Sequence, residues 1–147
     1  MVLEKMISFI YLLSVLPFFE SRYAIIILKL IYKNISFYHV IFLSILNSLI
    51  FFPLIIFLDK LHSYFYDNFD LYKKLFDKYI LKIRKKTQEI NELKYLGLFI
   101  YTFFPLPGSG VYTSTLISWI TNLNKRKSFI SIFFAIFLWN SLIYIIA

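Results

Sequence analysis

The chain has 147 residues, of which 60% are hydrophobic, and it carries a net charge of +8 with a mean hydropathy of +0.72. Soluble domains are only about 45–50% apolar, so this composition excludes an ordinary water-soluble domain and predicts an integral membrane protein. The absence of cysteine excludes disulfides and thiolate metal sites. The length leaves room for a single domain, residues 1–147.

The first half of the chain, residues 1–58, begins with two short apolar stretches. They cover Met6–Phe18 and Ala24–Tyr32, and a break that contains Pro17 separates them. Neither stretch reaches the roughly 20 residues that a helix needs to cross a bilayer. The longer uncharged stretch Phe37–Leu58 follows, and it is long enough to span.

The second half, residues 95–147, repeats this order. Short apolar stretches at Leu96–Phe104 and Val111–Leu123 flank a break rich in proline and glycine, and the uncharged stretch Ser128–Ala147 follows. Paired segments that are short and interrupted, in matching places of two halves, indicate a transport site near the membrane midplane. We therefore expect an all-α membrane protein with an inverted repeat, each repeat being a re-entrant helical hairpin plus a transmembrane helix.

The segment that joins the halves, residues 59–94, is charged. Apolar residues recur in it at steps of three and four, which predicts one amphipathic helix. They are Phe65, Phe69, Tyr72, Phe76, Tyr79, Ile83, Thr87 and Ile90. Two placements remain open, in the headgroup layer beside anionic lipid or over the transport domain as a lid, and contact with a second subunit is a further alternative. Without a nucleic-acid-binding motif, the positive charge does not predict a nucleic-acid partner.

The distribution of lysine and arginine predicts the topology. If Leu96–Leu123 enters the membrane and returns, residues 59–94 lie on the same side as Lys125, Arg126 and Lys127. Because short cytoplasmic loops are rich in basic residues, we expect residues 59–94 to be cytoplasmic, both termini to be outside, and the protein to be a multi-pass protein of the cell membrane.

Glu20, Ser21 and Arg22 form the first candidate site, at the break between the first two apolar stretches. A charged side chain inside a membrane is costly unless it is paired, faces a wet cavity or binds a ligand. A turn in the outer headgroup layer is the alternative, because neither charge is costly there. If the break lies at depth, Arg22 is expected to bind an anionic group of the substrate and Glu20 to couple transport to protons.

The second candidate site is the break at Pro105, Pro107, Gly108, Ser109 and Gly110. The prolines stop the preceding helix. A glycine-rich loop that opens onto a helix N-terminus can hold an anion through backbone N–H groups, so Gly108, Ser109 and Gly110 are candidate substrate-binding residues.

Asn47 and Asn140 occupy matching positions near the middle of the two predicted spans. Such residues commonly join transmembrane helices by hydrogen bonds. Their symmetry also makes them candidates for the walls of a substrate site.

At the two breaks the sequence resembles the small multi-drug export protein family, distant relatives of the DedA/VTT membrane proteins. The resemblance is carried by Leu16-Pro-Phe-Phe-Glu-Ser-Arg-Tyr-Ala-Ile25 and Phe104-Pro-Leu-Pro-Gly-Ser-Gly-Val-Tyr-Thr-Ser114. It implies opposed re-entrant hairpins with Glu20 and Arg22 in a central site, and an association with proton-linked transport or with movement of polyprenyl-phosphate lipids. DedA-type members carry an arginine in the second motif, whereas this chain has Ser109 and Thr113 there.

The function expected from these features is transport or lipid translocation of a small amphipathic or anionic substrate, with or without proton coupling. The alternative is a membrane scaffold or assembly protein that acts through its amphipathic helix. Enzymatic activity, a metal and a cofactor are not expected, because His39 and His62 lack metal-ligand spacing and no paired carboxylates recur. Expected partners are membrane lipids, the substrate and a second copy in a homodimer, since so small a chain could hardly enclose a path alone.

Overall fold

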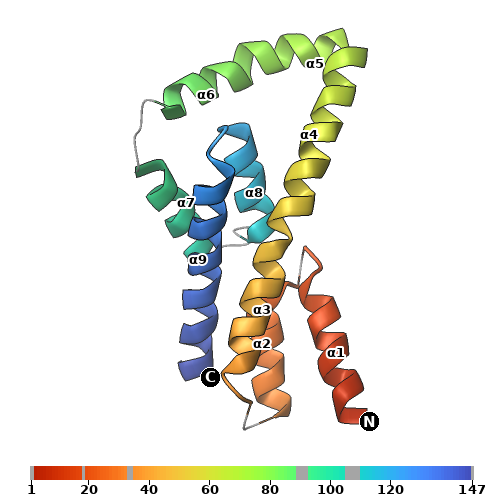
Figure 1. Ribbon diagram of the computed structural model, residues 1–147, viewed down its shortest axis with the longest axis vertical. Helices are drawn as coiled ribbons and strands as arrows, with labels where there is room; N and C mark the ends of the chain where they lie inside the picture. The colour runs from red at the N-terminus through yellow and green to blue at the C-terminus, as the bar shows by residue number, and fades with distance from the viewer. Residues whose placement is uncertain (1, 18, 33–34, 89–92, 105–109, 147) are drawn as a thin grey trace.

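A computed structural model describes residues 2–17, 19–32, 35–88, 93–104 and 110–146. Within these ranges all regular structure is helical (Figure 1), which confirms the all-α prediction. Pro105, Pro107, Gly108 and Ser109 of the second break, and Ile90 of the linker, lie outside the described residues.

The first hairpin consists of α1 (Val2–Ser14) and α2 (Glu20–Ile31). Helix α1 ends four residues earlier than the apolar stretch that predicted it, because Pro17 disfavours the helical conformation at the residue before it. At 13 and 12 residues, the two helices are each too short to cross about 30 Å of hydrocarbon.

The stretch predicted as one span is divided into α3 (Tyr38–Leu49) and α4 (Phe51–Asn68). The division at Ile50 has a local cause, since Pro53 has no N–H to donate and its ring crowds the carbonyl four residues earlier. Together the two helices form a segment of 31 residues, about 46 Å long, which extends ten residues beyond the predicted end at Leu58 and contains an apolar window long enough to span a membrane.

The linker is not the single helix that its apolar pattern predicts. The chain turns at Phe69, whose backbone is extended, and then forms α5 (Asp70–Leu75), a π-helical turn at Phe76–Ile80 and α6 (Leu81–Gln88). We call residues 70–88 the crossing segment. Tyr72 and Phe76 pack against other aromatic rings, whereas Tyr79 and Ile83 of the same stripe are exposed.

The second hairpin consists of α7 (Leu93–Phe103) and α8 (Val111–Ile120), which have 11 and 10 residues. A short turn then leads into α9 (Lys125–Ile146), a 22-residue helix. Helix α9 and the α3–α4 segment are both long and apolar enough to cross a membrane.

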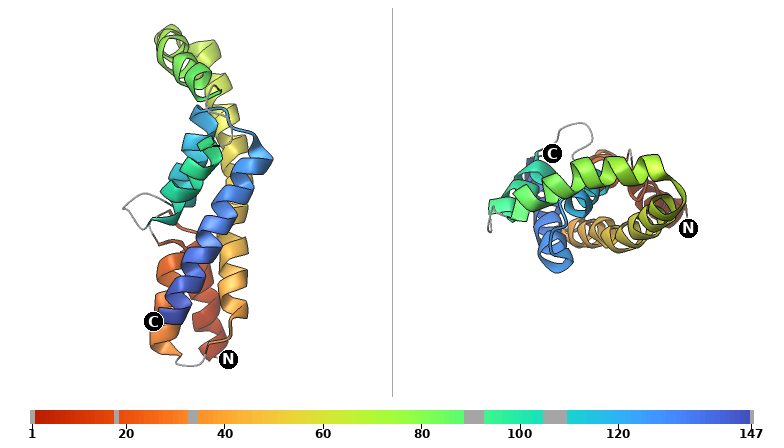
Figure 2. Two further views of the ribbon diagram at one scale, coloured as in Figure 1. Left: turned by 90° about the vertical axis from the view of Figure 1, so that its left-hand side faces the viewer. Right: turned by 90° about the horizontal axis from the view of Figure 1, so that it is seen from above.

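The elements are arranged along one long axis (Figures 1 and 2). Both termini lie at one end, and the crossing segment runs over the other end. The α1–α2 hairpin comes from the end with the termini and the α7–α8 hairpin from the opposite end (Figure 1), and the beginning of α2 lies near the end of α7 and the beginning of α8. Helix α9 packs against α2, α3 and α7 and ties the two hairpins together.

The surface is unusually apolar. Large hydrophobic side chains project outward from every long helix, and Leu30, Leu116, Phe134 and Ile145 are examples. Soluble monomers rarely expose contiguous apolar surface on this scale. Together with the two helices of membrane-spanning length, this surface indicates a membrane location.

Candidate functional site

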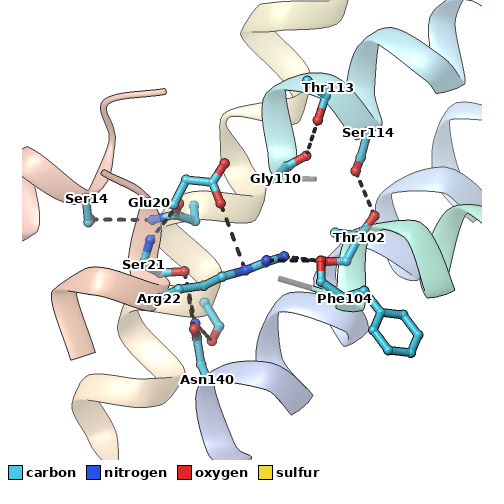
Figure 3. A network of polar contacts seen from close by, with 12 residues as sticks. Ser14, Glu20, Ser21, Arg22, Thr102, Phe104, Gly110, Thr113, Ser114 and Asn140 are labelled. Atoms are coloured by element: carbon cyan, nitrogen blue, oxygen red, sulfur yellow. Dashed lines mark hydrogen bonds and ion pairs between the residues drawn. The ribbon is translucent and has the colours of Figure 1, made fainter. Parts of the chain in front are cut away.

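Two opposite charges lie where the hairpin tips meet (Figure 3). Glu20 is the first residue of α2 and Arg22 follows in the same turn, with 4.0 Å between the Arg22 Nε and a Glu20 carboxylate oxygen. Their side chains are only 15% and 9% exposed. Buried charges require partners, and each of these two finds a second partner in the opposite hairpin.

Arg22 binds the end of α7. Its Nη1 donates to the Phe104 carbonyl at 3.4 Å and its Nη2 donates to the Thr102 carbonyl. The last carbonyls of a helix lack intrahelical donors and carry the negative end of the helix dipole. The guanidinium also lies 5.9 Å from the ring centre of Trp139 on α9, within range of a cation–π contact.

Glu20 lies against the beginning of α8. Gly110 is the N-cap residue of that helix, and a β-carbon added to it would lie 1.3 Å from Oε1 of Glu20. Only glycine leaves room for the carboxylate at this point, where the positive end of the α8 dipole favours a negative charge. Glu20 reaches this position with a φ of 37°, a left-handed conformation that is uncommon for residues other than glycine.

The charges of the first hairpin therefore compensate the dipoles of the second. The negative Glu20 faces the positive end of α8, and the positive Arg22 faces the negative end of α7. The partial charges at the end of α7 and at the beginning of α8 are thus offset by opposite charges on two side chains of α2. The same arrangement means that a change of charge at Glu20 alters the balance at both helix ends.

A hydrogen-bonded network of small polar side chains supports α2. The Ser21 N–H at the start of α2 donates to Asn47 Oδ1 at 3.2 Å, so that Asn47 of α3 satisfies one of the free donors there. Asn140 of α9 donates to Ser21 Oγ at 3.0 Å and to Ser44 Oγ at 2.9 Å. All four residues are buried, and the network joins α2, α3 and α9 at one level.

Two further contacts fix the second hairpin. Thr102 and Ser114 share a hydrogen bond of 2.8 Å that links α7 to α8, and the Tyr112 hydroxyl donates to the Val15 carbonyl in the first break. The sequence alone did not predict a role for Thr102, Ser114, Tyr112, Ser44 or Trp139. A signal existed for α3, where Ser44, Asn47 and Ser48 follow helical spacing in an apolar stretch and mark one polar face.

The structure brings together Glu20, Arg22, Asn47, Asn140 and Gly110, five of the residues that the sequence singled out. Arg22 and Gly110 were expected to contact an anionic group of the substrate. In the structure Arg22 donates to protein carbonyls, and Gly110 faces the carboxylate of Glu20. Pro17 lies exposed at the break, next to this site. No group of three or more potential metal ligands occurs among the described residues, and His39 instead shares a hydrogen bond with Tyr11.

The comparisons with known proteins give one result. The family model described as "Putative small multi-drug export protein" matches residues 20–142, which include Glu20, Arg22, the α7–α8 hairpin and the crossing segment. No curated protein and no solved structure matches the chain significantly. The matched region begins at Glu20 and covers most of the sequence, so the chain belongs to the small multi-drug export protein family.

Proposed function

We propose that this protein is a proton-coupled membrane transporter or lipid translocase whose site lies between the two hairpin tips. The observation that carries the proposal is the placement of Glu20 and Arg22 on two opposed helix ends. The family description, multi-drug export, supports a transport role. The substrate class we propose is a small amphipathic or anionic molecule, either drug-like or bearing a lipid phosphate.

Protonation of Glu20 is the proposed coupling step. A proton on the carboxylate removes its charge, and with it the attraction to Arg22 and to the N-terminus of α8. Arg22 then carries a positive charge without its acidic neighbour and attracts an anionic group of the substrate. Release of the proton reverses the change, so that the substrate and the negative form of Glu20 compete for the same positive surroundings.

The membrane arrangement that we propose follows from the helix lengths. Helices α3–α4 and α9 span the bilayer, whereas the two hairpins enter from opposite faces and end near its midplane. The crossing segment and Lys125, Arg126 and Lys127 face the cytoplasm, in keeping with the excess of basic residues there. A homodimer would enclose the path that one small chain leaves open to lipid.

A scaffold function is the second candidate, and the attachment of the crossing segment favours it. Arg84 of α6 donates its Nε to the Ile120 carbonyl at 3.0 Å and its Nη2 to the Trp119 carbonyl at 3.2 Å. The lysines of the crossing segment, among them Lys85 and Lys86, are exposed and available to a partner. In that case mutation of the lysines would abolish function and Arg22→Ala would be harmless.

Reconstitution into liposomes that contain a pH-sensitive dye tests the transport proposal. Ethidium and anilinonaphthalene sulfonate, a cationic and an anionic amphipathic probe, would be added in the presence of a pH gradient. We expect the wild type to couple probe movement to proton movement and E20Q to uncouple them, while D70N, at an exposed carboxylate on α5, behaves as the wild type. Unchanged coupling in E20Q would exclude Glu20 from the proton pathway.

A further inference from the structure

A cavity of about 130 Å³ lies beneath the crossing segment, at the opposite end of α8 from Gly110. Its walls come from α4, α6, α8 and the turn that leads into α9. The polar side chains that line it are Asp59, His62, Arg84, Ser118, Asn122 and Lys125. The cavity is larger than a single water molecule requires, and the transport proposal assigns no role to it.

Ser118 is one of the residues that line this cavity, and its hydroxyl is buried beside it without a partner among the described residues. The residue is 1% exposed, and its Oγ makes no hydrogen bond within the part of the chain that the structure describes. Buried hydroxyls almost always have a partner, and leaving one unsatisfied is unfavourable. The oxygen is covered in this structure, so a rotation of the Ser118 side chain toward the cavity would let a ligand there accept its hydrogen bond.

The charges around the cavity favour an anion. Arg84 and Lys125 are positive and Asp59 is the one acidic side chain in the lining, which leaves an excess of one positive charge. Both Asp59 oxygens are already engaged, one with Trp119 Nε1 at 2.8 Å and the other with Lys125 Nζ at 2.9 Å. A cation would have to displace these donors, whereas an anion would meet Arg84 and Lys125 directly.

Arg84 has donors to offer. Its two bonds to the carbonyls of Ile120 and Trp119 use two of the five N–H groups of a guanidinium. The rings of Phe76 and Trp119 lie 5.1 and 5.5 Å from its central carbon and hold its plane in place. A guanidinium that is fixed in this way is suited to bind phosphate oxygens.

The depth of the cavity matches that of lipid headgroups. Asp59 is the first charged residue after the uncharged stretch 37–58, and Lys125 is the first residue of α9. The buried apolar residues Ile55 and Leu123 also line the cavity, and Trp119 is a residue typical of membrane interfaces. Basic pockets between transmembrane helices at this level bind the headgroups of anionic lipids.

We propose that this cavity is a binding site for a phosphate group, which accepts hydrogen bonds from Ser118 and Arg84 and is attracted by Lys125. The phosphate belongs to an anionic lipid headgroup or to a soluble phosphate compound, because the same donors recognise both. The site is separate from the proposed transport site and does not depend on a proton-coupled mechanism.

Tryptophan fluorescence of the full chain in detergent tests this proposal. The W139F variant leaves Trp119, which lines the cavity, as the only tryptophan. Inorganic phosphate and short-chain phosphatidic acid would be titrated separately, with short-chain diacylglycerol as the lipid that lacks phosphate. We expect a saturable change with phosphatidic acid and none with diacylglycerol. A saturable response to inorganic phosphate as well identifies the phosphate group alone as sufficient, and its absence identifies the lipid headgroup as the ligand.

Three variants made in the W139F background distinguish binding in this cavity from nonspecific attraction of phosphate to exposed basic residues. S118A removes a single oxygen that has no partner among the described residues, so it should fold as the parent does and weaken binding about tenfold. R84Q should weaken binding at least as much, and K85Q, at an exposed neighbouring residue, should not change it. The proposal is wrong if no phosphate compound gives a saturable change, or if S118A binds as tightly as its parent while K85Q weakens binding equally with R84Q.

Discussion

Oε1 of Glu20 lies where the β-carbon of any other residue at position 110 would be, 1.3 Å from the position of such an atom on Gly110. The two residues belong to different hairpins that come from opposite ends of the molecule. The Glu20 carboxylate therefore occupies the space that a side chain at position 110 would need. This contact brings a charge of the first hairpin to the positive end of a helix in the second.

Substitution of Gly110 by alanine should displace Glu20 without unfolding the protein. The atoms in conflict with the new methyl group belong to the far end of a flexible side chain, which can turn away. We expect G110A to abolish proton-coupled flux in liposomes and to lower the free energy of unfolding in detergent by about 1–3 kcal/mol, which leaves the protein folded. Flux and unfolding would be measured on the same preparation.

Gly97 provides the matched control for this change. It lies within α7, and a β-carbon there would meet no atom within 4 Å. G97A should therefore keep its flux and gain about 0.5–1 kcal/mol of stability, because alanine is favoured over glycine in a helix. If G97A and G110A lost flux equally, the contact with Glu20 would not explain the glycine.

Neutralising Arg22 alone should be more harmful than neutralising both charges. R22Q leaves Glu20 in a buried position without its counter-charge, and breaking a buried pair in this way destabilises by about 3 kcal/mol. In E20Q/R22Q no uncompensated charge remains, so part of the stability should return. Unfolding in mixed micelles would measure both variants, and a double variant less stable than R22Q would contradict the pairing.

Asn140 should hold three helices together through its amide. N140A removes the hydrogen bonds to Ser21 and Ser44, and bonds between membrane helices are worth about 0.6 kcal/mol each. We expect a loss of about 1 kcal/mol, about half of which disappears when S44A is already present, because the bond to Ser21 remains. S141A is the control, because that hydroxyl bonds to the Phe137 carbonyl of its own helix. Additive effects of N140A and S44A would show that the two side chains do not interact.

The sequence predicted the all-α class, the four short helices and the two long apolar segments, because proline, glycine and charge interrupt otherwise apolar stretches. It identified Glu20 and Arg22 for the same reason, as charges between apolar arms. It did not indicate that Gly110 faces Glu20, since a contact between hairpins depends on how α9 packs them together. For Gly108 and Ser109 the expectation of an anion site stays a prediction.

The crossing segment shows where a periodic pattern misleads. Its apolar residues keep a helical spacing through Phe69, yet the chain turns there, and the expected single stripe is divided between α4 and the crossing segment. Spacing reports the period of a helix but not whether one helix continues. The aromatic residues near the turn pack around His62, whereas Tyr79, farther along, does not.

Labelling of single cysteines should place both basic regions on one side of the membrane. The chain has no native cysteine, so Q88C in the crossing segment, N124C before α9 and S36C near the other end would each report one exposed position. In inside-out vesicles an impermeant thiol reagent should label Q88C and N124C, and in right-side-out cells it should label S36C. This follows from the cytoplasmic preference of lysine and arginine.

The comparison of Q88C with N124C decides between one crossing and a returning hairpin. Helices α7 and α8 together have 21 residues, enough for one span if they were continuous. A single crossing would place the two cysteines on opposite sides, and each vesicle type would then label only one of them. Labelling of both cysteines from the cytoplasmic side would require α7 and α8 to return to the face from which they enter. Because α9 begins at Lys125, the basic first turn of α9 would then lie on the same side as the crossing segment.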